Sequence, residues 1–339
     1  MAMTAKEIIS YMETLRDEKQ RKILMRFFKT APGEYGYGDE FLGIKVPRTR
    51  EVVRVAKDLT LSEVPELLMS RWHEVRLCGL LILVAKFEKL ATKRLENDME
   101  ATRKRDEIVK LYLKYAERAN NWDLVDLSVH KIIGHWLLLP TFLGSMPEFS
   151  PNGLSCVNEE ADSKSSMEDL AYSRVGEEFK GAGEIVRELN GAFKEADRGL
   201  IESDSNFPKL DEKTQMTDGE SQKIIPSLNR AYKLTILDSL AQSPCLWLQR
   251  MSIVSSWKTS QQGDPSWCLR YAEIHLHHPH DLMHKAVGWM LREMGKRVSM
   301  DLLRDFLRQH AHEMPRTTLR YAIEKMSEQE RRMWMAKPT

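Results

Sequence analysis

The segment NNWDLVDLS at residues 120–128 places one tryptophan and two aspartates within about one helical turn. Trp122 and Asp126 are four residues apart, so both lie on the same side of a helix. An aromatic ring beside a carboxylate is suited to chemistry on a developing cation. The structural alternative makes Trp122 a core residue, Asp123 a first-turn acid that interacts with the helix dipole, and Asp126 an ion-pair partner. Taken alone, the segment favours this structural interpretation.

A second helical segment, HKAVGWMLREMGKR at residues 284–297, combines cations with a tryptophan. Cations in a row can each meet a phosphate, and an aromatic face attracts cations. An exposed tryptophan covered by lysine and arginine stems, or packed on a neighbouring helix, explains the pattern equally well. The apolar face holds Val287, Met290, Leu291 and Met294, and the opposite face holds Lys285, Trp289, Arg292 and Lys296.

Two further segments contain residue types that could carry chemistry. In LWLQRMSIVSSWK at residues 246–258, Arg250 and Trp257 are seven residues apart and share a helix face, with Lys258 about a quarter turn away. The histidines of HLHHPHDLMH at residues 275–284 are interrupted by a proline and lack an HExxH pattern, so we predict no metal site there. Nucleotide-binding and serine-hydrolase motifs are missing from the sequence, and no cofactor is predicted.

The net charge of +1 conceals two oppositely charged parts. Residues 151–220 contain 17 Asp and Glu against 8 Lys and Arg, a net charge of −9, so the rest of the chain carries +10. A basic body suits a polyanionic partner, although the excess is modest. No apolar run approaches the roughly 20 residues that a membrane span needs, so no membrane association is predicted.

Helical periodicity dominates the chain on either side of the acidic part. Apolar residues recur at intervals of three and four, short Pro, Gly, Asn or Asp breaks separate the runs, and alternating strand patterns are essentially missing. We therefore predict an all-α, HEAT-like helical-repeat solenoid, formed as a single domain by residues 1–142 and 231–339. Residues 143–230 are predicted to be a largely disordered acidic insertion, because Ser, Asp, Glu, Gly and Asn predominate there.

Six segments of the chain, taken in their order along the sequence, resemble those of a known protein family. The chain is similar to the AlkD-like DNA alkylation repair glycosylases, which are HEAT-like solenoids, over nearly everything except residues 143–230. The resemblance is specific because of the combination and order of segments, and any one of them alone would not establish it. The matching segments are YGYGDEFLGIKVPRTREV, RWHEVRLCGLLILV, NNWDLVDLS, LAQSPCLWLQRMSIV, KAVGWMLREMGK and MPRTTLRYAIEKMSEQERR.

The resemblance implies excision of N3- and N7-alkylated purines from double-stranded DNA without base flipping. It implies a catalytic role for Trp122, Asp126 and Trp289, and phosphate contacts for Arg250, Lys258 and Arg292. We expect Lys285 and Lys296 to extend the same basic, concave face, and the protein to act as a monomer in the cytoplasm or nucleus. A non-catalytic binder of damaged or branched DNA and a HEAT-type protein scaffold remain alternative hypotheses.

Overall fold

The computed structural model describes residues 3–142 and 218–336, and side chains in the second range from residue 229 onward. Within these ranges the chain forms helices, three short 3₁₀ turns and one isolated β-bridge between Glu40 and Trp72. The all-α helical-repeat class predicted from periodicity is therefore confirmed. The first range contains α1 (Ala5–Thr14), α2 (Glu18–Phe27), α3 (Val46–Val55), α4 (Val64–Leu68), α5 (His73–Leu90), α6 (Met99–Lys114) and α7 (Trp122–Trp136). The second contains α9 (Asp218–Ala241), α10 (Leu246–Gln261), α11 (Ser266–Ile274), α12 (Asp281–Arg297), α13 (Met300–His310), α14 (Arg316–Ala322) and α15 (Glu328–Met335).

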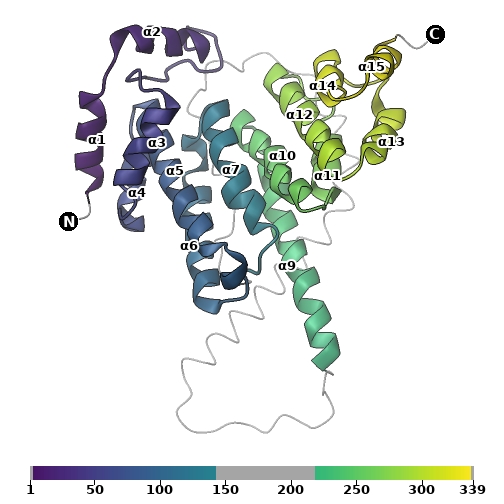
Figure 1. Ribbon diagram of the computed structural model, residues 1–339, viewed down its shortest axis with the longest axis horizontal. Coiled ribbons are helices and arrows are strands. Elements are labelled where there is room, and N and C mark those ends of the chain that lie inside the picture. Colours follow the sequence, from purple (N-terminus) through teal and green to yellow (C-terminus); the bar gives the residue numbers. More distant parts are fainter. Residues whose placement is uncertain (1–2, 143–217, 337–339) are drawn as a thin grey trace.

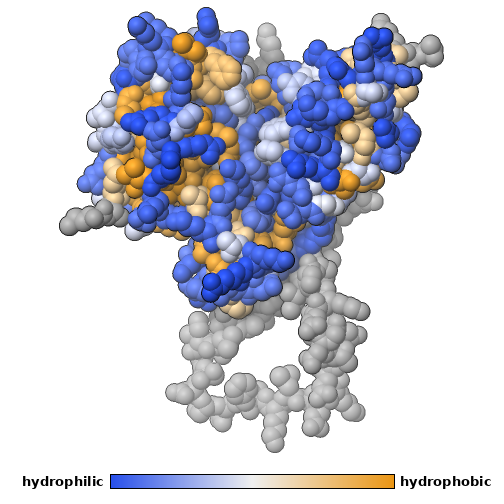
Figure 2. Space-filling view, in the orientation of Figure 1, coloured by the Kyte–Doolittle hydropathy of each residue, from blue (hydrophilic) through white to orange (hydrophobic). Residues whose placement is uncertain are grey.

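Four helices form a packed row through the centre of the molecule. α5 packs against α7, α7 against α10, and α10 against α12, so the row joins the parts of the chain before and after residues 143–217 (Figure 1). The surface is notched between the elements around α2 and those around α12, as the upper part of Figure 2 shows. The last residue of α2, Phe27, lies against Trp122 at the start of α7, and Leu282 near the start of α12 accepts a hydrogen bond from Arg250 of α10.

Helix α9 begins at Asp218, inside the range predicted to be an insertion, and continues to Ala241. Residues 143–217 lie outside the described residues, so their predicted disorder stays a prediction. None of the described helices is long and apolar enough to cross a membrane.

Glycines allow close approaches between helices, both within the central row and between this row and α14. A methyl group added at Gly134 of α7 would overlap the Ser255 carbonyl oxygen of α10. A methyl group at Gly288 of α12 would overlap the Thr318 carbonyl oxygen of α14. These glycines let the backbones approach closely, which brings the side chains on neighbouring helices within hydrogen-bonding reach.

Both ends of α7 are held by polar contacts. At its start, the Asn121 side chain accepts a hydrogen bond from the Trp122 N–H at 2.9 Å. At its end, the buried Lys233 ammonium of α9 donates to the Leu137 and Leu139 carbonyls, which the helix itself cannot satisfy. Burial lowers the pKa of Lys233 to about 7. The orientation of α7 is thus fixed along its length, and with it the direction of its polar side chains.

Candidate functional site

Asp126 and Arg250 meet across the α7–α10 contact. The Arg250 guanidinium binds the carboxylate through two parallel hydrogen bonds, Nε to Oδ1 at 2.9 Å and Nη2 to Oδ2 at 2.8 Å. Its third nitrogen, Nη1, donates to the Leu282 carbonyl of α12 at 2.6 Å. The side chains of Asp126 and Arg250 are 14% and 5% exposed. Arg250 therefore ties three helices together and holds the Asp126 carboxylate in one orientation.

The electrostatic environment of Asp126 contains opposing effects. Burial raises the pKa of its carboxyl group, the Arg250 guanidinium opposes this, and the carboxylate of Asp123 adds to the rise. The arrangement gives one carboxylate, partly open to solvent, in a low-dielectric setting where it interacts strongly with any nearby positive charge.

Trp122 lies one turn before Asp126, at the first position of α7, and is half-buried among aromatic rings. Phe28 stacks on it with ring centroids 5.3 Å apart, and Phe27 meets it edge-on at 5.8 Å. Burial raises the pKa of Tyr35, and the Trp122 side chain opposes this rise. The Tyr35 ring in turn lies 6.1 Å from Trp247 and so spans from the N-terminal elements to α10. Trp122 is consequently fixed by contacts from α2 and from the loop that follows it.

On the other side of Asp126, a second aromatic cluster joins α7, α10 and α12. His130, one turn after Asp126, lies 4.4 Å from Trp257, and Trp257 lies 5.1 Å from Trp289, measured between ring centroids. Burial lowers the pKa of His130 to about 4, so this imidazole is neutral at neutral pH. Helical spacing predicted only that Trp257 shares a face with Arg250, and no local pattern predicted His130 or Tyr35 at the site.

The predicted DNA-binding cations divide into paired and unpaired groups. Lys285 pairs with Asp281 at 2.6 Å, and Arg292 pairs with Glu324 and, at 3.2 Å, with Glu293. Lys258 is half-buried and Lys296 is exposed, and neither forms an ion pair with any residue in the described ranges. Lys258 and Lys296 can therefore meet a polyanion without breaking an existing contact. A phosphate contact by Arg250, Lys285 or Arg292 stays a prediction and requires sharing or exchange of a carboxylate partner.

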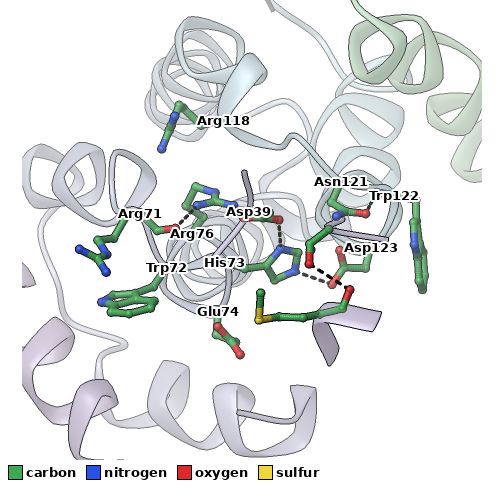
Figure 3. Close-up of polar contacts among 12 residues, drawn as sticks. Asp39, Arg71, Trp72, His73, Glu74, Arg76, Arg118, Asn121, Trp122 and Asp123 are labelled. Atoms are coloured by element: carbon green, nitrogen blue, oxygen red, sulfur yellow. Dashed lines mark hydrogen bonds and ion pairs between the residues drawn. The ribbon is translucent and has the colours of Figure 1, made fainter. Parts of the chain in front are cut away.

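A buried charged cluster lies directly behind Trp122 (Figure 3). Asp123 Oδ2 accepts from His73 Nε2 at 3.0 Å, and Asp39 Oδ2 accepts from His73 Nδ1 at 2.7 Å. The other oxygen of Asp39 pairs with Arg76. Asp123 does occupy the first turn of α7, as predicted, but its ion-pair partner His73 lies 50 positions away and was not predicted. The interpretation of Asp123 as only a first-turn acid was therefore too narrow.

The two carboxylates determine the charge of His73. Burial alone lowers its pKa, but the adjacent Asp123 and Asp39 carboxylates outweigh burial and raise the pKa to about 10. Burial raises the pKa of Asp39, but His73 and Arg76 lower it to about 2. The cluster thus consists of two cations and two anions, which matches the requirement that buried charges be paired.

The fold and the site together define an all-α helical-repeat protein with an aromatic, carboxylate and guanidinium site on its central helices. The model of the DNA alkylation repair enzyme family matches residues 8–152 and 157–326, so the chain belongs to that family. A comparison with curated proteins gives no match. Membership of this family indicates an enzyme with a role in DNA repair and DNA as its partner.

Proposed function

We propose that the protein is a DNA glycosylase that hydrolyses the N-glycosidic bond of N3- and N7-alkylated purines in double-stranded DNA. The observation that carries the proposal is the Asp126 carboxylate, oriented by Arg250 at 2.8 and 2.9 Å and one helical turn from the Trp122 ring. The residues fit the proposed chemistry because an alkylated purine is cationic and already a good leaving group, so no strong general acid is needed.

In the proposed reaction the bond between C1′ and the purine nitrogen breaks, and its electron pair neutralises the cationic base. Positive charge then develops on the deoxyribose, where Asp126 stabilises it. Water adds to C1′ and gives up one proton, for which the Asp126 carboxylate is a base within the site. Trp122 and Trp289 enclose the sugar, and their ring faces attract it more strongly as its charge grows.

The remaining residues position the DNA. Arg250 orients Asp126 and favours its ionised form, and its N–H groups that are not bound to Asp126 or Leu282 are proposed to reach a backbone phosphate. Lys258, Lys285, Arg292 and Lys296 bind further phosphates, which sets the register without reading sequence. The predicted set lacks a base-reading amide, which supports recognition through the backbone without base flipping. A single chain supplies every group in the scheme, so we propose a monomer that acts in the cytoplasm or nucleus.

The test measures release of 7-methylguanine from methylated double-stranded DNA by wild-type protein and by Asp126→Asn. We expect the wild type to release 7-methylguanine and Asp126→Asn to release almost none, while the variant still binds DNA in a salt-sensitive manner. The matched control is Asp238→Asn, because Asp238 forms the same two-fold contact with Arg270, at 3.1 and 2.8 Å, and is 13% exposed. Loss of this second pair should leave excision unchanged. Full excision by Asp126→Asn would refute the proposed role of that carboxylate.

One observation favours the second candidate, a non-catalytic binder of damaged or branched DNA. Each oxygen of Asp126 already accepts a hydrogen bond from Arg250, as expected for a carboxylate with a purely structural role. Each oxygen nevertheless keeps a second lone pair. This candidate predicts salt-dependent DNA binding and no base release by the wild type. A protein scaffold, the third candidate, predicts no DNA affinity at all, and a gel-shift assay at two salt concentrations distinguishes it.

A further inference from the structure

A hydrogen bond of His73 reaches Asp123, the residue that directly follows Trp122. His73 is the first residue of α5 and is 2% exposed. Its two ring nitrogens bind Asp39, which lies in the loop before α3, and Asp123, which directly follows Trp122 in the first turn of α7. The first turn of α7 is therefore anchored to the start of α5 by a contact one residue away from the Trp122 side chain.

A second connection runs through stacked rings. Phe41 stacks on the His73 imidazole with centroids 4.4 Å apart and planes at 21°. Phe28 lies 5.0 Å from the same imidazole and also stacks on Trp122, with centroids 5.3 Å apart and planes at 29°. Phe28 thus lies between the imidazole and the indole, so displacement of the imidazole changes the surface on which the indole rests.

The hydrogen-bond partners themselves define the charge of this ring. Ionised carboxylates only accept hydrogen bonds, so an imidazole that binds one through each nitrogen carries a proton on both. Arg76 holds the second oxygen of Asp39 and donates to the Ser70 and Arg71 carbonyls at 3.0 and 2.9 Å. Asp39 is therefore locked in place, and the imidazolium cannot rotate without losing a charged partner.

We infer that His73 is a positioning residue for Trp122, which acts by fixing the first turn of α7 through Asp123 and the ring stack through Phe28. The inference rests on the proposed function in one respect only, because it takes Trp122 to contact the sugar of the damaged nucleotide. His73 itself lies behind the ring and touches neither DNA nor the reacting atoms. Its effect on excision is exerted through the orientation of the indole.

The direct test observes the indole itself. Protein labelled with 5-fluorotryptophan contains eight labelled residues, and the ¹⁹F resonance of Trp122 is assigned by its disappearance in Trp122→Phe. We expect His73→Gln to shift or broaden the Trp122 resonance while the resonance of Trp267, buried in α11, stays in place. The control is His275→Gln, which removes a histidine of equal burial, 3% exposed and bound to Ser252. It should leave the Trp122 resonance unchanged.

The functional test is a double-mutant cycle for release of 7-methylguanine. Misplacement of a positioning group by about 1 Å can cost about 100-fold in rate, so we expect His73→Gln to lower kcat by about 10- to 100-fold in the wild-type background. In the Trp122→Phe background the same substitution should have an effect several-fold smaller. Purely structural damage by His73→Gln would instead lower activity equally in both backgrounds.

If His73→Gln does not fold, Asp123→Asn carries the test, since it removes one charge of the cluster while it keeps an acceptor oxygen. An unmoved Trp122 resonance, or equal losses of excision in both backgrounds, overturns the inference. A wild-type protein that releases no alkylated base contradicts the proposed function, yet the resonance shift still decides the positioning role of His73. The two failures are therefore distinguishable.

Discussion

The charge of His73 leads to a pH dependence of folding stability that can be measured directly. The pKa of His73 is raised from its ordinary value of 6.5 to about 10, so the folded protein holds a proton that the unfolded chain releases between these values. The resulting stabilisation is fully present below the unfolded pKa and is lost as pH rises through the folded pKa. The charged groups that face the imidazole are Asp39 and Asp123, and Arg76 lies beyond Asp39.

The size of the effect follows from the size of the pKa change. Each pKa unit corresponds to about 1.4 kcal/mol, so a rise from 6.5 to about 10 corresponds to about 5 kcal/mol of stability at low pH. The imidazole is buried, so solvent screens this contribution little. From about pH 7 to about pH 9.5 the contribution should fall by about 3 kcal/mol. Urea denaturation followed by circular dichroism across this pH range measures it.

The informative quantity is the difference between two pH profiles. Burial lowers the pKa of Lys233 to about 7, so Lys233 contributes stability that rises over the same pH range in both proteins, and the wild-type profile alone does not isolate His73. Relative to wild type, His73→Gln should lack the falling contribution of His73 and also carry a pH-independent loss from the broken contacts. The control is again His275→Gln, because burial lowers the pKa of His275 to about 3 and this group does not titrate above neutrality. Parallel profiles for wild type and His73→Gln would refute the assignment of a protonated His73 and leave only neutral hydrogen bonds in the cluster.

Three further predictions concern the central helices. Gly134→Ala should destabilise the fold by about 1–3 kcal/mol or more, because the added methyl overlaps the Ser255 carbonyl and separates α7 from α10; thermal denaturation measures the loss. Arg250→Lys keeps the positive charge but loses the two-fold contact with Asp126, and base release should fall by at least about tenfold. Unchanged release would show that the charge is sufficient and that orientation of Asp126 by Arg250 is not required. Lys296→Ala should weaken DNA binding and reduce the salt slope by about 1, as titrations at several salt concentrations will show; an unaltered slope would remove Lys296 from the interface.

Local patterns predicted the helices on either side of the acidic part and the relations within one helix. The recurrence of apolar residues identified the helices on both sides of residues 143–217, because a helix repeats every 3.6 residues whatever it packs against. The same periodicity placed Trp122 and Asp126 one turn apart. It could not locate the start of α9 at Asp218, since the polar composition of that region favours disorder over a helix boundary.

Contacts between helices required the tertiary structure. Asp126 and Arg250 are 124 positions apart, and Asp123 and His73 are 50 apart, so no local pattern pairs them. Periodicity identifies the apolar face of each helix. It identifies neither the helix that packs against this face nor the offset of the two helices along their axes. Those depend on the close approach allowed by Gly134 and on side chains such as Lys233 that fix helix ends. The sequence by itself thus determined the helices and the chemistry they could carry, while packing decided which charges meet, because the energy of an ion pair depends on separations that only the folded chain sets.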